Sequence, residues 1–131
     1  MHPKTQAKIH EVTQACLDNT MNFPSAVQAL LGVEVSHYRV DYIRNEKAVY
    51  LRNGESIVET LDLSHEPIGP AFEAEEVCAA IKSSQTEGQP FRTFVDRTKK
   101  AGCIGYTAYL DGQKVVYNGR LGEEHVELFP A

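Results

Sequence analysis

The stretch GEEHVELF, Gly122 to Phe129, nearly repeats the stretch GESIVETL, Gly54 to Leu61. Aligning the two glycines gives an offset of 68 residues. The same offset matches residues well upstream of the quoted stretches: Tyr38 with Tyr106, Phe23 with Phe91, Val27 with Val95, and Ile9 with Val77. So many matches at one spacing indicate that the chain contains two copies of one supersecondary unit.

The register of the repeat shifts once in the sequence comparison. Lys47, Val49 and Tyr50 match Lys114, Val116 and Tyr117 at an offset of 67, before the glycines restore the offset of 68. Since turns tolerate insertions best, we expect one hairpin of the second copy to be a residue shorter and its next turn a residue longer.

Each copy predicts a helix, a shorter helix and a three-stranded antiparallel meander. Apolar residues at helical spacing place the first helices at 4–19 and 74–86. Alternation at Tyr38, Val40 and Tyr42 predicts a strand, and Asp111-Gly112 predicts a hairpin, because a type I′ turn needs positive φ. Gly102 is placed to end the second short helix, whereas its counterpart is Glu34. We therefore expect the first short helix to end at Gly32 instead.

The whole chain, 1–131, is thus expected to be a single α+β domain built by internal duplication. The repeats run from about 4 to 63 and from 73 to 131, with a Pro-containing linker at 64–72. Two copies can pack about a pseudo-two-fold axis. The strands can form one six-stranded sheet or two packed layers, and the sequence does not decide between them.

Composition limits the classes of function. The chain has 131 residues, 42% apolar and 24% charged, with a formal net charge of −5, as in a globular protein of one domain. No apolar run is long enough to span a bilayer, and no secretory signal is recognised, so we expect a cytoplasmic protein without a membrane partner. The one basic cluster, around Lys99 and Lys100, is too short to indicate nucleic-acid binding.

The three cysteines, Cys16, Cys78 and Cys103, are far apart and lack the spacing of a zinc site. We interpret them as buried structural thiols. No cofactor is expected.

The sharpest local motif is Glu123-x-His125-x-Glu127. Alternate residues of a strand share a face, so the two carboxylates and the imidazole are candidate ligands of a divalent metal, and His125 and Glu127 are candidate acid–base catalysts. The alternative is an exposed polar strand face with cross-strand charge pairs. We favour this alternative, because the first copy carries Ile57 in place of the histidine.

A second candidate is a cleft between the halves, lined by Tyr38, Tyr106, Glu59 and Glu127, that binds a small polar ligand. The alternative is an internal hydrogen-bonded brace that recurs because the unit recurs. We favour the brace, since buried carboxylates must be paired or hydrogen-bonded.

The stretches VSHYRVD, YLRNGESIVE and HVELFP resemble a small uncharacterised family of bacteria and prophages, whose members are often labelled phage envelope protein. The residues that carry the resemblance span nearly the whole chain: Val35, Tyr38, Val40, Asp41, Tyr50, Gly54, Glu55, Val58, Glu59, Gly105, Tyr106, Gly122, Glu123, His125, Val126, Glu127 and Phe129. Glu34 departs from the pattern, which has a glycine there. The resemblance implies an α+β fold, and it implies no activity, cofactor or catalytic residue.

The sequence therefore favours a non-enzymatic binding or interaction module that holds a protein or a small polar ligand as a monomer or small homo-oligomer. One alternative is a small metal-dependent or acid–base enzyme that uses Glu123, His125 and Glu127. A second is a virion structural component, although the acidic composition offers no obvious lattice surface.

Overall fold

The computed structural model describes residues 1–130 and contains the predicted order of elements twice. The first copy has α1 (Pro3–Leu17), α2 (Phe23–Leu31), β1 (Val35–Asp41), β2 (Glu46–Leu51) and β3 (Ser56–Thr60). The second has α3 (Ala74–Glu87), α4 (Phe91–Lys100), β4 (Cys103–Tyr109), β5 (Lys114–Gly119) and β6 (Glu124–Leu128). The α+β prediction is confirmed.

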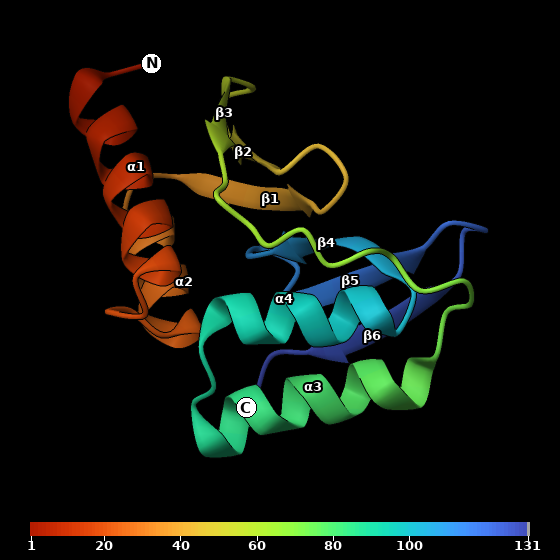
Figure 1. The fold of residues 1–131 in the computed structure, drawn as a ribbon. Coiled ribbons are helices and arrows are strands. Elements are labelled where there is room, and N and C mark those ends of the chain that lie inside the picture. The colour runs from red at the N-terminus through yellow and green to blue at the C-terminus, as the bar shows by residue number, and fades with distance from the viewer. Residues whose placement is uncertain (131) are drawn as a thin grey trace.

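The six strands form one antiparallel sheet in the order β3-β2-β1-β4-β5-β6, so the two meanders join through β1 and β4 (Figure 1). At the centre of this pairing Arg39 faces Thr107, its own equivalent 68 residues later. On either side, the amide of Tyr42 donates to Ile104 and the amide of Leu110 donates to Ser36, over 3.0 and 2.9 Å. These two bonds are related by the repeat, so a pseudo-two-fold axis passes through the Arg39–Thr107 pair.

The expected shift of register between the copies is wrong. Tyr38 pairs with Val49 across β1 and β2, and Tyr106 pairs with Tyr117 across β4 and β5. Val49 therefore corresponds to Tyr117 at an offset of 68, and both hairpins have the same length. The positive φ of the second hairpin falls on Gln113 (55°), matching Asn45 (55°), and not on Gly112. The residues compared at an offset of 67 are similar in type but do not occupy equivalent positions in the two halves of the sheet.

The first short helix ends at Gly32 as expected, because Gly32 is its C-cap. Gly32 nevertheless keeps right-handed helical angles, with φ of −64°. Glu34 takes the left-handed conformation, φ 68°, as Gly102 does in the second copy, φ 86°. The backbone of the repeat is therefore kept here even though the side chain is unfavourable for it. Glu34 also pairs with Arg52, whose guanidinium lies 2.6 Å from its carboxylate.

The helices cover one face of the sheet and bury the core there (Figure 1). Ile9 and Val12 of α1 are buried, as are their equivalents Val77 and Ala80 of α3. The segment after β3 belongs to the same layer: the ammonium of the buried Lys99 donates to the Ser64 carbonyl over 2.9 Å. The expected linker is thus bound along α4. None of the helices within residues 1–130 is long and apolar enough to cross a membrane.

Candidate functional site

The sheet face turned away from the helices is left uncovered by the fold. We call it the open face, and it carries every second strand residue, including His37, Arg39, Ala48, Tyr50, Val58, Thr107, Tyr109, Val116, Asn118, Val126 and Leu128. Several of its apolar side chains are exposed, with Val58 at 57%, Val126 at 47% and Leu128 at 70%. Solvent-exposed apolar side chains gathered on one surface mark interaction sites more often than scattered ones do.

Three rings form a stack across the middle of the open face. His37 on β1 pairs with Tyr50 on β2 and with Tyr109 on β4. Its imidazole lies parallel to the Tyr50 ring, with centroids 4.6 Å apart, and stacks on the Tyr109 ring at 5.8 Å. Ser36 Oγ holds the imidazole from the side, 2.7 Å from Nδ1. Cross-strand aromatic contacts of this kind fix the rings in place before any partner arrives.

Arg39 lies beside this stack, at the pseudo-two-fold axis. Its Nη1 donates to Thr107 Oγ1 and to Asn118 Oδ1, each over 3.1 Å. Arg44, Arg52 and Arg92 form ion pairs with carboxylates, whereas Arg39 has no such partner within the described part of the chain. The alternation of residues along β1 places Arg39 on the polar face of that strand. Only the order of the strands shows that β1, and with it Arg39, lies in the middle of the sheet.

The four residues of the candidate cleft do not come together at one place. Tyr38 and Tyr106 are buried beneath the helices, where their rings meet edge to face at 6.4 Å. Burial raises the pKa of both phenols. Glu59 and Glu127 lie on β3 and β6, the two opposite edges of the sheet. No single pocket can therefore include both tyrosines and both glutamates.

Each of the two glutamates instead contacts one imidazole. His10 Nδ1 of α1 lies 3.2 Å from Glu59 Oε2, and His125 Nε2 of β6 lies 3.1 Å from Glu127 Oε2. The two histidines are not equivalent in the repeat, because the position that matches His10 is Cys78. Each half thus has a histidine–glutamate contact at its own edge strand, β3 or β6, but the imidazole comes from α1 in the first half and from β6 itself in the second.

Of the Glu123-His125-Glu127 motif, the structure brings together the last two residues. Glu123 precedes β6, and its carboxylate accepts a hydrogen bond from the Leu121 amide over 2.9 Å, closing the turn. Within residues 1–130 no three His, Cys, Asp or Glu side chains are placed to hold a metal ion. The neighbour of His125 is Cys78 of α3, with Sγ 3.4 Å from Nε2.

The interpretation of all three cysteines as buried is wrong for Cys78, which is exposed on α3. Cys103 is buried and Cys16 is half-buried. Burial raises the pKa of the Cys16 thiol, and it raises that of Cys103 to about 11.

Lys47 is a buried charge that the sequence analysis missed. It faces the helices from β2, with Nζ 3.3 Å from Thr13 Oγ1 and 4.4 Å from the centroid of the Tyr38 ring. Burial lowers the pKa of Lys47 to about 8. Electrostatic attraction to Cys16 and Glu59 acts in the opposite direction and raises it, by less. The signal was present in the strand alternation, which puts residue 47 on the same side as Val49 and Leu51.

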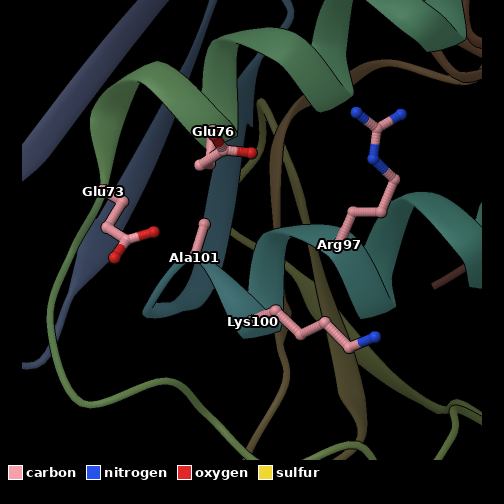
Figure 2. Close-up of a pocket in the computed structure, with 5 residues that line it drawn as sticks. All are labelled: Glu73, Glu76, Arg97, Lys100 and Ala101. Carbon is pink, nitrogen blue, oxygen red and sulfur yellow. The ribbon is translucent and has the colours of Figure 1, made fainter.

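The helix layer contains one shallow hollow of about 190 Å³, between the start of α3 and the end of α4. Figure 2 shows Glu73, Glu76 and Ala101 around it, while the side chains of Arg97 and Lys100 extend away from the two carboxylates. Pockets that enclose small organic ligands are usually about 300–1,000 Å³. The hollow is thus small for such a ligand, and its charges do not converge on one point.

The chain was compared with known proteins. Residues 10–126 match the model of the family described as "Protein of unknown function (DUF1398)", which covers most of both repeats. No curated protein matches the chain.

Proposed function

The chain belongs to this family of unknown function, and we propose that it is a non-enzymatic interaction module that binds a partner protein through its open face. The partner presents a carboxylate to Arg39, with apolar residues around that carboxylate. The observation that carries this proposal is the central arginine, which has no carboxylate partner within residues 1–130 and lies beside an aromatic stack on an uncovered sheet.

The shape of the surface supports a protein rather than a small molecule as the ligand. The hollow between α3 and α4, of about 190 Å³, and a smaller one of about 70 Å³ beside Gly102 and Arg120 are both lined by residues outside the open face. At roughly 4.8 Å between strands and 3.4 Å per residue, six strands of about six residues present on the order of 600 Å² in projection. Side-chain relief increases the accessible area further, toward the roughly 800 Å² that each partner buries in a standard interface.

The residue types support the same conclusion. Arginine and tyrosine are enriched among the residues that dominate binding energy at the centres of protein interfaces. Here Arg39, Tyr50 and Tyr109 occupy the centre, and Val58 and Val126 flank them on the edge strands. Thr107 and Asn118 use only Nη1 of Arg39 in the hydrogen bonds described, so the guanidinium retains donors that a carboxylate can accept from.

A second copy of the chain fits this surface less well. In a face-to-face dimer that covers the whole open face, the two-fold axis passes over the middle of that face, so the centre of one face meets the centre of the other. Arg39 is at that centre. Two guanidinium groups of like charge would therefore lie against each other there, and both would lose their bound water. A partner with an acidic group at its centre avoids this repulsion. The resemblance of the chain to bacterial and prophage proteins supports a bacterial or phage protein as that partner.

The test uses a random dodecapeptide library displayed on phage, selected against the full chain. We expect enrichment of peptides with Asp or Glu between apolar residues. Labelled versions of these peptides should bind at least about tenfold more weakly to Arg39→Glu, a loss of about 1.4 kcal/mol. The control Lys8→Glu makes the same charge change on α1, on the far side of the sheet, and should leave affinity unchanged.

Three outcomes would overturn the proposal. The first is enrichment of peptides without acidic residues, and the second is equal binding to wild type and Arg39→Glu. The third comes from sedimentation equilibrium: a wild-type dimer that Arg39→Glu or Val126→Asp dissociates would make a second copy the occupant of the face.

A further inference from the structure

We propose that Cys78, with His125 and Glu127, forms a reactive thiol site that exchanges with low-molecular-weight disulfides. The site lies at the edge of the helix layer, between α3 and β6, and is separate from the open face. It is a modification site: its product is the protein carrying a mixed disulfide at Cys78.

The three side chains are placed for this chemistry. Cys78 Sγ lies 3.4 Å from Nε2 and 3.8 Å from Nδ1 of His125, so the sulfur borders the imidazole edge that carries both nitrogens. Glu127 Oε2 is 3.1 Å from Nε2. With Nε2–H donating to this carboxylate, Nδ1, 3.8 Å from Sγ, is the nitrogen left to take the thiol proton. The carboxylate then stabilises the imidazolium that results. The side chain of His125 is 21% exposed, with the Tyr117 ring behind it at 6.3 Å, so the imidazole is held against the sheet.

Access distinguishes this thiol from the other two. Cys78 is exposed, so a disulfide in solution can reach its sulfur, whereas Cys16 and Cys103 lie partly or wholly inside the core. Glu75 is one turn before Cys78 and Lys82 is one turn after it, whereas Glu76, two residues before, lies on another side of α3. The charges of Glu75 and Lys82 oppose each other, so the base for this thiol must be His125.

The repeat indicates that the site is not required by the fold. In the first copy His10 stands in the position of Cys78, and Ile57 stands in the position of His125. Glu59 is the equivalent of Glu127 and contacts His10 at 3.2 Å. The corresponding edge of the first copy, at β3, thus forms without a thiol. Only the second copy brings a thiol, an imidazole and a carboxylate together at this position.

The reaction balances without a further oxidant. The thiol proton passes to His125, and the thiolate sulfur attacks one sulfur of the disulfide RSSR. A new S–S bond forms to Cys78 while the S–S bond of RSSR breaks. The leaving RS⁻ takes up a proton from the imidazolium or from water, so protein-SH and RSSR become protein-SSR and RSH. Cys78 is oxidised, and one RS unit is reduced.

The experiment follows the reaction of the full chain with oxidised glutathione by intact-protein mass spectrometry, with peptide mapping to locate the adduct. We expect one adduct, at Cys78, that Cys78→Ser removes. His125→Ala should slow its formation about tenfold, and Glu127→Gln should slow it severalfold. His10→Ala removes the corresponding histidine–glutamate contact in the first copy and should leave the rate unchanged.

A second measurement separates chemistry from folding. The ultraviolet absorbance of the thiolate, titrated in Cys78→Ser, His125→Ala and wild type, reports whether His125 favours the charged sulfur. Far-ultraviolet circular dichroism and continued protection of Cys16 and Cys103 show that each variant is folded. Reaction of wild-type Cys78 no faster than that of a disordered peptide of the same α3 sequence would refute the proposal. So would an unchanged rate in folded His125→Ala.

Discussion

Lys47 allows the energetics of the helix–sheet core to be tested through a single charge. Its ammonium group is buried on β2, where only Thr13 Oγ1, at 3.3 Å, accepts a hydrogen bond from it in the described structure. Val115 occupies the equivalent position in the second copy and is also buried. An apolar side chain therefore fits this site in the same backbone, which makes Lys47→Met a conservative change in shape and removes the charge.

The sign of the pH dependence follows from the lowered pKa. Burial takes the pKa of Lys47 from 10.5 to about 8, so the unfolded chain binds this proton more tightly than the folded one. Folding is penalised below the lower value, and stability rises with pH between the two. The full difference corresponds to roughly 3 kcal/mol, of which about 2 kcal/mol is regained between about pH 7 and pH 9.5.

Urea unfolding of wild type and Lys47→Met over this pH range measures the effect. The difference in free energy of unfolding, mutant minus wild type, should fall by about 2 kcal/mol as pH rises. Taking this difference removes most of the opposing contribution of Cys16, whose raised pKa lowers stability at alkaline pH in both proteins. Lys8→Met on α1, where the lysine side chain is 43% exposed and pairs with Glu11, is the control for loss of a lysine charge outside the core. A constant difference for Lys47→Met would refute the assignment of a buried, destabilising charge.

Further predictions concern the backbone and the core. Glu34→Gly should raise the free energy of unfolding by about 0.5–1 kcal/mol in urea titrations, because glycine relieves the left-handed φ of 68°; a loss of stability would show that the Arg52 contact outweighs the strain. Gly102→Ala should cost at least about 2 kcal/mol by calorimetry, because its Cβ would overlap the Ala71 carbonyl. Gly122→Ala, at a similar φ but with no atom within 4 Å, should cost about half as much, and equal costs would mean that the contact is irrelevant. Tyr42→Phe should cost about 1 kcal/mol, since it removes the buried 2.9 Å hydrogen bond to Thr98; unchanged thermal unfolding would contradict this.

Most of the fold could be predicted from the sequence, because the repeat presents each helix and strand twice. Where one copy was ambiguous, as at the hairpin after Tyr42, the other carried Asp111-Gly112. Predictions failed where residue identity was compared between the copies without regard to backbone conformation. This comparison allowed a one-residue slip that the strand register excludes, and it did not predict that Glu34 adopts the left-handed conformation of Gly102. Local preference is a weak guide at such positions, because tertiary contacts can hold an unfavourable residue in a required conformation.

The sites were harder to predict because they depend on contacts between elements distant in the sequence. His125 and Glu127 were identified from their strand spacing, but Cys78 joins them from a helix that ends long before β6 begins. Arg39 became a candidate only when the strand order placed it at the middle of the sheet. Alternation along one strand gives the face of a side chain, and it does not say which strands lie beside it.

Divergence between the copies is the strongest indication of where this chain is specialised. The backbone keeps its register through every strand pair, so each side chain has a matched position in the other half. Residues needed by the architecture should be alike at matched positions, as Tyr38 and Tyr106 are. Arg39 faces Thr107, and Cys78 corresponds to His10, so neither is required by the fold that both copies share. A single arginine at a symmetric centre also makes the open face asymmetric, which suits a partner different from the chain itself better than a second copy.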